Sequence, residues 1–320
     1  MSQQPLVSII TPCYNGAAVI GRMIESVLVQ TYDRIEYILV NDGSTDNTER
    51  VVLSYQERFK KRGYRFLYVK QENGGLGAAI NAGLKIFTGD YLCWADADDF
   101  YAPTSVEKRV TWMEAHPEYG VITSDAYIVK EGAVDQPIRT VSSGIPDNEK
   151  EEQFWNLLNC ESIFIPGTHM ARAAMFLRQY PGRRIYPARR GQDWQLLLPM
   201  YYHYKRHFLD EPLFYYVVSD NSMSRDDSVE KKLYRCDEHE NILLHTLGDF
   251  QMSDSDREKA VQQVRVNYAR RRLSIAFRAG KKDVAEHAFQ ALKKEHADCA
   301  RHRVYRFGAK HPWARKLLGK

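Results

Sequence analysis

The sequence WADADDF at residues 94–100 places three carboxylates at the end of an apolar run. That run, YLCWA at residues 91–95, is typical of a buried strand, and ligands of open α/β sheets bind at the carboxyl ends of such strands. Alternation along a strand puts Asp96 and Asp98 on one face, where two close carboxylates repel unless a cation lies between them. Oxygen ligands of this kind suit Mg²⁺ or Mn²⁺ held jointly with a phosphate-bearing substrate. Taken alone, the segment fits a solvated acidic turn equally well.

The pattern upstream of this segment predicts an α/β architecture. Strands and helices alternate, and each strand is followed by a cluster of turn residues. Such alternation calls for a parallel sheet with helices on both faces. Farther along, the pattern predicts a strand at 121–123, a loop at 131–150, a helix over 193–204 and helices from residue 230 to the end. The predicted early strands are 6–10, 35–40, 66–69 and 91–95, with helices at 18–30, 51–59 and 76–87.

The composition is that of a globular protein with a sizeable core, since 44% of the 320 residues are hydrophobic and 27% are charged. Five cysteines without a CxxC pair argue against a zinc site or a disulfide framework and fit a reducing compartment. The sequence shows no signal peptide and no run of about 18 apolar residues. We therefore expect a cytoplasmic protein.

Charge is distributed unevenly along the chain. Residues 257–320 contain 18 Lys and Arg against 5 Asp and Glu, so the remainder of the chain is net acidic. Basic residues mixed with Trp and Leu suit contact with a membrane surface, and a solvated helix hairpin packed on the main domain is the alternative. No RNA- or DNA-binding motif accompanies the charge, so nucleic acid is not an expected partner.

Four short motifs, each at a predicted strand end, resemble those of glycosyltransferase family 2. They are VSIITPCYN at residues 7–15, VNDGSTD at 40–46, QENGG at 71–75 and DADD at 96–99. The likeness is good over about the first 125 residues and weaker beyond them. It implies a GT-A fold, with a Rossmann-like nucleotide-binding half of mostly parallel sheet that continues into an acceptor-binding half. The implied divisions are residues 1–125, residues 126–225 and a basic helical extension at residues 226–320.

The resemblance places a nucleotide-diphosphate sugar at these strand ends. Tyr14 would stack on the nucleobase and the backbone of Pro12 would hydrogen-bond to it; a proline-fixed turn with a packed tyrosine is the alternative. An ionised Asp42 can accept the imino N–H of uracil, which favours UDP and leaves dTDP and GDP open. Asn81, in the helix that follows the QENGG motif, would point into the nucleotide-sugar site; a buried structural role is the alternative. The other residues placed beside the nucleotide are Asn15, Asn73 and Gly75.

The Asp96-Ala97-Asp98 segment matches the motif of the family known as DxD. The resemblance implies that Asp96 contacts the ribose or the metal and that Asp98 ligates Mn²⁺ or Mg²⁺. Such a cation neutralises the leaving diphosphate as the glycosidic bond breaks.

An inverting transfer needs a base that accepts the proton of the acceptor hydroxyl. The resemblance gives this role to Asp193, in GQDWQL at residues 191–196, although Gln192 stands where the family usually has Glu. The N-terminus of the following helix is expected to keep the Asp193 carboxylate ionised, which makes it a weak base. A helix cap is the alternative role for Asp193.

Five further residues are candidates for contact with the acceptor or the diphosphate. Trp194 offers a surface for sugar stacking, or else packs in the core. His169 lines the acceptor site, or is structural. Arg190 contacts the diphosphate or an acidic acceptor, or belongs to a solvated loop. Ser222 and Ser224 lie in a segment that resembles a family loop closing over the diphosphate.

The leading interpretation is an inverting, metal-dependent glycosyltransferase that uses a UDP-sugar and a glycan or lipid-linked acceptor in surface polysaccharide synthesis. With a lipid-linked acceptor, the basic extension would hold the protein at the inner face of the cell membrane. One alternative is a non-catalytic protein that binds nucleotide sugars or carbohydrates. The other is a nucleotidyltransferase on a related fold. Residues 11–16 argue against it, because they lack the glycine-rich basic loop expected of such enzymes.

Overall fold

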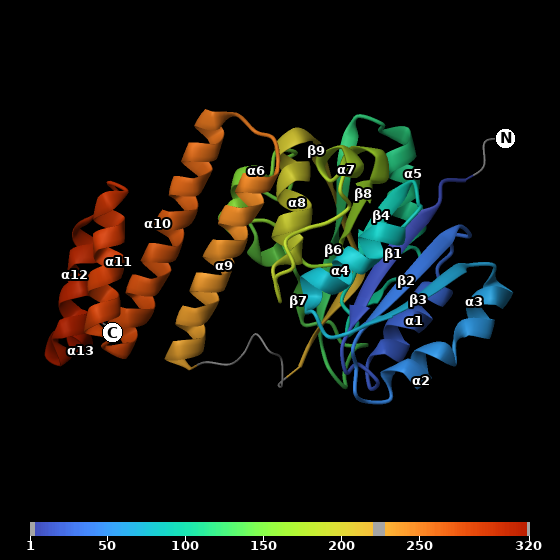
Figure 1. Cartoon of the computed structure of the whole chain (residues 1–320), viewed down its shortest axis with the longest axis horizontal. Helices are drawn as coiled ribbons and strands as arrows, with labels where there is room; N and C mark the ends of the chain where they lie inside the picture. Colours follow the sequence, from blue (N-terminus) through green and yellow to red (C-terminus); the bar gives the residue numbers. More distant parts are fainter. Residues whose placement is uncertain (1–3, 220–227, 319–320) are drawn as a thin grey trace. The chain divides into compact units, whose positions relative to one another are not determined.

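The computed structural model describes residues 4–219 and 228–318. The chain divides into two compact units, Met1–Ser219 and Asp220–Lys320 (Figure 1). The first unit contains the sheet, and the second is helical over most of its described residues. All four motifs that suggest a nucleotide-sugar site therefore lie in the first unit.

One sheet of nine strands runs through the first unit, in the order β3-β2-β1-β4-β8-β6-β9-β5, with β7 paired to β6. β1 pairs in parallel with β2 and β4, and β2 pairs in parallel with β3, so the carboxyl ends of these strands meet at one edge. β8 runs antiparallel to both β4 and β6. The strands are β1 Val7–Cys13, β2 Ile35–Asp42, β3 Arg65–Gln71, β4 Tyr91–Trp94, β5 Phe100–Tyr101, β6 Tyr119–Lys130, β7 Arg139–Thr140, β8 His169–Arg172 and β9 Lys205–Val218.

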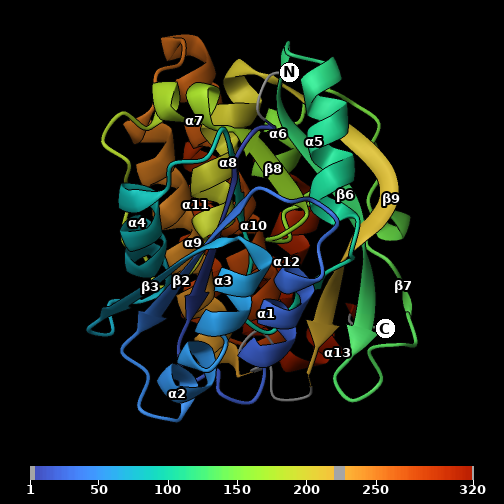
Figure 2. The ribbon, with the colours of Figure 1, turned by 90° about the vertical axis from the view of Figure 1, so that its right-hand side faces the viewer.

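Helices cover both faces of the parallel strands, as the alternating sequence pattern predicts (Figure 2). Ile9 of β1 packs in a core with Met23 of α1 and Val110 of α5. The next residue, Ile10, faces the other way and meets Gly83 of α4, because successive side chains of a strand alternate between faces. The helices of this unit are α1 Ile20–Leu28, α2 Thr48–Leu53, α3 Gln56–Arg62, α4 Leu76–Ile86, α5 Ser105–Ala115, α6 Phe154–Leu158, α7 Ala173–Gln179 and α8 Gln192–His203.

Three predicted elements differ from the structure in instructive ways. The helix expected over residues 51–59 is two helices, α2 and α3, with Ser54 and Tyr55 between them. The strand expected at 121–123 is far longer, because β6 pairs along its length with the distant strand β9. Part of the expected loop at 131–150 forms β7, again by pairing with β6. Each difference arises from pairing or packing partners that are remote in the sequence.

The second unit is a set of helices with an alanine- and leucine-rich core. Leu273, Ala285 and Leu292 are fully buried within it. Ser253 begins the long helix α10 by accepting a hydrogen bond from the backbone N–H of Asp256. No helix in the described ranges combines the length and the apolar content that a membrane crossing requires. The helices are α9 Val229–Asp249, α10 Asp254–Ala279, α11 Lys282–Lys294, α12 Ala300–Lys310 and α13 Pro312–Leu318.

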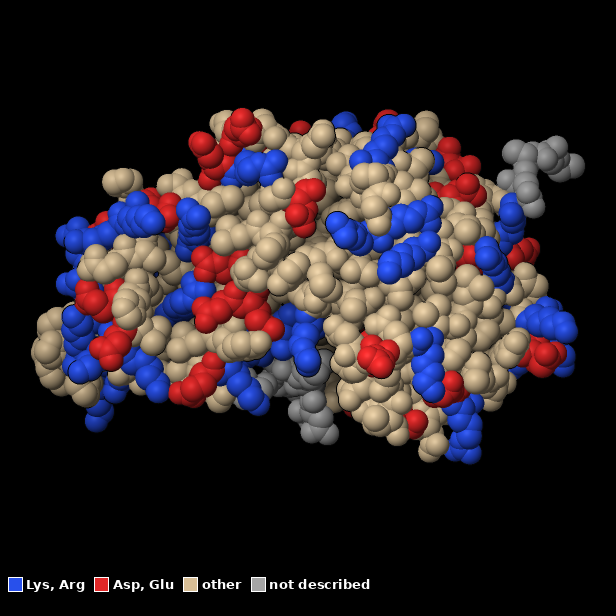
Figure 3. Space-filling model, viewed as in Figure 1, with Lys and Arg blue, Asp and Glu red and all other residues tan. Residues whose placement is uncertain are grey.

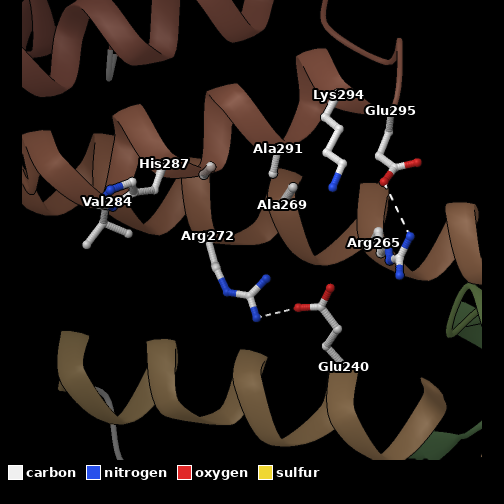
Figure 4. A pocket seen from close by; sticks show the side chains of 10 residues that line it. Glu240, Arg265, Ala269, Arg272, Val284, His287, Ala291, Lys294 and Glu295 are labelled. Atoms are coloured by element: carbon white, nitrogen blue, oxygen red, sulfur yellow. Dashed lines mark ion pairs between the residues drawn. The ribbon is translucent and has the colours of Figure 1, made fainter. Parts of the chain in front are cut away.

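A groove of about 490 Å³ lies among α9, α10 and α11 of this unit (Figure 4). Alanine side chains on α10 and α11 leave the space open. Arg272 of α10 forms an ion pair of 2.5 Å with Glu240 of α9, and Arg265 lies 3.7 Å from Glu295. Opposite charges along the groove thus pair with each other.

The close contact between α4 and β1 predicts the effect of a single methyl group. Gly83→Ala is expected to destabilise the first unit by about 1–3 kcal/mol, because the added Cβ would lie 2.5 Å from Ile10 Cγ2. Helix propensity alone would favour alanine by about 1 kcal/mol. Denaturant unfolding measures the change. Gly248→Ala in α9 is the control, because no atom lies within 4 Å of its added Cβ; an equal stabilisation by both variants would contradict this account.

Candidate active site

A buried hydrogen bond joins the acidic motif to the predicted base. Trp94, the last residue of β4, donates from Nε1 to Asp193 Oδ1 at 2.9 Å, across 99 positions of sequence. Asp193 lies in the first turn of α8, and the charge of Asp96 is among the causes that raise its pKa. The fold therefore brings together the carboxylates of Asp96 and Asp193, which the sequence places far apart.

The electrostatics at Asp193 differ from the sequence-based expectation. Burial, followed by the charge of Asp96, raises the pKa of Asp193 well above its usual range. The expectation that the helix N-terminus keeps this carboxylate readily ionised is therefore wrong. Loss of hydration outweighs both the helix dipole and the hydrogen bond from Trp94, because the residue is only 8% exposed. Nor is Asp193 the helix cap, a position that Gly191 occupies.

The three acids after β4 have separate surroundings. Asp99 is buried and accepts a hydrogen bond from the backbone N–H of Val217 at 2.8 Å, so it anchors β9. Asp98 is exposed, and its backbone carbonyl accepts a hydrogen bond from Arg22. Burial and the charge of Asp98 raise the pKa of Asp96 to about 7. Asp96 and Asp98 are thus the two carboxylates of the motif that remain available to a ligand.

These two carboxylates fit a divalent cation. Burial and the charge of Asp98 raise the pKa of Asp96, and no positive group among the described residues is a cause that lowers it, so a cation at this point would relieve an electrostatic cost. Among the described residues, no three His, Cys, Asp or Glu side chains are grouped closely enough to hold a metal ion by themselves. One or two carboxylates combined with substrate phosphates is the usual arrangement for Mg²⁺.

Asp42, at the end of β2, holds the glycine loop in place. Its Oδ1 accepts hydrogen bonds from Gln71 Nε2 at 2.7 Å and from the backbone N–H of Gly74 at 2.9 Å. Its Oδ2 accepts from the backbone N–H of Gly75 at 2.9 Å. A carboxylate has about four lone-pair positions, so one of them remains for a further donor such as a nucleobase N–H.

The loop after β1 is tied to the loop after β2. The Asn15 backbone N–H donates to Ser44 Oγ at 2.9 Å, and Asn15 Oδ1 accepts from the backbone N–H of Thr45 at 2.8 Å. Asn15 therefore shapes the site through its backbone N–H and its Oδ1 atom. Pro12 is buried, whereas Tyr14 is 53% exposed and so can stack on a flat ligand.

The start of α4 packs against a segment just before α8. The backbone N–H of Gly77 donates to the Ala188 carbonyl at 2.8 Å, and an added Cβ at Gly75 would lie 3.1 Å from Arg189 Cγ. The Asn81 amide exchanges two hydrogen bonds with the backbone of Ile185, at 2.9 and 2.7 Å. These contacts correct the role expected for Asn81, which positions the segment that leads to Asp193. Asn73 remains exposed on the glycine loop.

Two of the acceptor candidates are interior residues. His169 is fully buried, stacks on Trp94 with ring centroids 6.0 Å apart, and has its pKa lowered well below the usual range by burial. Trp194 is 5% exposed and stacks on Phe164, with ring centroids 5.9 Å apart. Neither presents an open surface to a sugar, because packing against other rings covers it.

The remaining candidates are less defined by their surroundings. Arg190 is half-buried, next to Arg189 in the segment that packs on the glycine loop. Ser222 and Ser224 lie outside the described residues.

Sequence reasoning missed the hydrogen bond from Trp94 to Asp193, although a signal existed. A buried indole N–H usually has a partner, and Trp94 closely precedes the acidic motif.

Comparison with known proteins decides the family. The profile described as glycosyl transferase family 2 matches residues 8–233, more than half of the chain. The chain belongs to glycosyl transferase family 2. An uncharacterized glycosyltransferase of Rickettsia prowazekii is 38% identical over 149 residues, which make up 47% of this chain and 43% of that protein. EpsE of Bacillus subtilis is 31% identical over 198 residues, covering 62% of this chain and 67% of EpsE. The chain thus matches less than half the length of the Rickettsia relative.

Solved structures confirm the expected GT-A fold. Residues 1–349 of TarS from S. aureus superimpose with a TM-score of 0.62 at 15% identity, covering 98% of this chain and 92% of that one. The mannosyltransferase PcManGT from Pyrobaculum calidifontis superimposes with a TM-score of 0.55 at 18% identity, covering 99% and 87%. At these sequence identities, the likeness to the two solved structures shows the fold alone.

The raised pKa of Asp193 predicts a pH-dependent gain in stability on its removal. An unfolded Asp titrates near a pKa of about 3.9, so ionisation of Asp193 disfavours the folded state increasingly as the pH rises above about 4. In the presence of a chelator at pH 8, Asp193→Asn is expected to raise the free energy of unfolding by roughly 1–3 kcal/mol, with a smaller gain near pH 4. Denaturant titrations at both pH values measure it.

Asn at position 193 keeps the shape of the side chain and still offers an oxygen to Trp94. The control is Asp135→Asn, at an exposed position, for which no difference between the two pH values is expected. A gain that is equal at pH 8 and near pH 4 would contradict the assignment of the pKa.

Proposed function

We propose that this chain is an inverting glycosyltransferase that moves a sugar from a nucleotide-diphosphate donor to a hydroxyl of a glycan or lipid-linked acceptor. The observation that carries the proposal is the placement of Asp193 against the strand of the acidic motif, through its hydrogen bond with Trp94. A base within the same site as the metal-binding carboxylates is what a single displacement requires. Membership of glycosyl transferase family 2 supports the same reaction class.

The donor site is proposed to take a UDP-sugar. Tyr14 would stack on the base, the remaining lone pair of Asp42 would accept its imino N–H, and Asn73 and Gly75 would lie beside the nucleoside. A TarS structure holds UDP-GlcNAc, and the PcManGT structure holds GDP-Man and Mn²⁺, which supports nucleotide-diphosphate sugars as the donor class. Asp96 and Asp98 would hold Mn²⁺ or Mg²⁺, which when bound supplies positive charge against the leaving diphosphate.

Asp193 has the properties of a general base. Its raised pKa brings the carboxylate closer to the operating pH, where a base is most effective. Trp94 occupies Oδ1, so Oδ2 is the atom proposed to accept the proton of the acceptor hydroxyl. The freed oxygen attacks the anomeric carbon on the face opposite the diphosphate, and this single displacement inverts the configuration. Trp94 thus orients the base and stabilises its charged form.

Surface polysaccharide synthesis is the proposed setting, with a lipid-linked glycan as one acceptor class. Asp193 accepts the hydroxyl proton whether the acceptor is a free or a lipid-linked glycan. His169 and Trp194 are buried, so they are not proposed to contact either acceptor. Arg190 and the segment with Ser222 and Ser224 remain the proposed contacts to the diphosphate or the acceptor.

The test is a thermal-shift titration with UDP, dTDP and GDP, each with and without Mn²⁺. We expect UDP to raise the melting temperature only when Mn²⁺ is present, because the ligand stabilises the folded state in proportion to its occupancy. Asp98→Ala should remove most of this shift, equivalent to at least a tenfold loss of affinity. Asp135→Ala, at an exposed position, should leave the shift unchanged.

Two results would overturn the proposal. One is the absence of stabilisation by any nucleoside diphosphate, and the other is an equal shift with Asp98→Ala. If nucleotides bind normally, release of UDP from a panel of UDP-sugars tests the chemistry. Asp193→Asn should reduce that release at least a hundredfold while UDP affinity stays within about twofold, because a general base typically contributes 10²–10⁴-fold. Unchanged release in this variant would contradict the role of Asp193 as the base, and no release from the unaltered chain would leave only a binding function.

A further inference from the structure

Helices α12 and α13 expose three large apolar side chains. Val304 is 40% exposed, Phe307 45% and Trp313 63%. The Phe307 and Trp313 rings meet edge to face with centroids 5.9 Å apart, and His311 lies 4.3 Å from Phe307 and 6.4 Å from Trp313. Single exposed apolar residues are normal, but a connected group marks an interaction surface. We call Val304, Phe307, His311 and Trp313 the terminal patch.

The opposite side of α12 explains why these residues face outward. Ala309 belongs to the core of the second unit, and Gly308 lies so close to Phe277 that an added Cβ would be 2.5 Å from its ring. Tyr305 stacks on Phe277 with centroids 4.6 Å apart. These contacts fix the rotation of α12, so Val304 and Phe307 cannot turn inward without breaking them.

The terminal patch lies in a segment without acidic residues. Residues 299–320 contain seven Lys and Arg and no Asp or Glu. Arg301, Lys310 and Lys316 are exposed there. Lys310 and Arg306 share Glu286 of α11, at 2.7 and 3.5 Å, and Arg303 pairs with Asp298 at 3.3 Å, so these two acids offset only part of the positive charge of the segment. Figure 3 shows Lys and Arg predominating over α11 to α13, with a few Asp and Glu among them.

We propose that the terminal patch docks the protein on an anionic lipid bilayer. Trp313 and Phe307 would enter the boundary between headgroups and acyl chains, where aromatic rings are favoured, and the Lys and Arg side chains would contact the anionic headgroups. Each basic residue near such a surface strengthens binding by roughly fivefold. This docking is independent of the donor site, and it would bring the enzyme to the surface where a lipid-linked acceptor resides.

Two other occupants fit the terminal patch less well. A second copy of the chain would bring two surfaces of the same sign together, and such like charges repel across a symmetric interface. A nucleic acid would match the charge and could stack on Trp313, but it would leave Val304 against polar groups. A bilayer satisfies the apolar and the basic components together.

The experiment is co-sedimentation of the full chain with phosphatidylcholine vesicles and with mixed phosphatidylcholine and phosphatidylglycerol vesicles. We expect binding to the anionic vesicles only, weakening with added salt, and a blue shift of tryptophan fluorescence on binding. Trp313→Ser should reduce the partition coefficient at least tenfold. The matched control is Tyr234→Ser, which removes a 60% exposed aromatic residue from α9 of the same unit and should change the coefficient less than twofold.

Other outcomes would overturn the proposal. A wild-type chain that stays in the supernatant with anionic vesicles contradicts it, and so does equal loss of binding in both variants. RNA binding that depends on Trp313 without vesicle binding would assign the terminal patch to nucleic acid, and a Trp313-dependent dimer in light scattering would assign it to self-association. The UDP-dependent thermal shift of Trp313→Ser shows that the variant folds, and it separates failure of docking from failure of the proposed transferase function.

Discussion

Withdrawal of two carboxylates from water is the constraint around which the first unit is organised. Asp96 and Asp193 both carry raised pKa values because burial removes hydration and each lies in the field of another carboxylate. The indole N–H of Trp94 donates a hydrogen bond to Asp193 and partly offsets this cost. A fold that maximised stability alone would not retain this electrostatic cost. Carboxylates with raised pKa values are characteristic of sites that bind or react.

The rest of the site is rigid because hydrogen bonds join the ends of separate strands. Asp42 at the end of β2 holds Gly74 and Gly75, and Asn15 after β1 holds the loop that follows β2. The start of α4 in turn rests on the segment that leads into α8. Side chains that look like ligand contacts in the sequence therefore build the walls of the site, and fewer groups are left to touch a ligand.

The second unit follows a different logic. Its core consists of small and leucine side chains packed between helices, and its oppositely charged residues form pairs, as with Arg272 and Glu240. The end of the unit differs in composition, because α12 and α13 combine exposed rings with basic residues and contain no acids of their own, although Lys310 pairs with Glu286 of α11. A solvated helix does not require exposed aromatic rings, and a buried helix does not require basic residues.

The sequence by itself predicts the order of strands and helices, the acidic motif after β4 and Asp193 as the candidate base, because these depend on local periodicity and on short motifs. Only the tertiary structure decides the length of β6, the burial of His169 and Trp194, and the hydrogen bonds by which Asn81 holds Ile185. So is the raised pKa of Asp193, since hydration and the distance to Asp96 are properties of the folded chain. Local patterns encode which groups are present, whereas packing between remote segments determines which of them water or a ligand can reach.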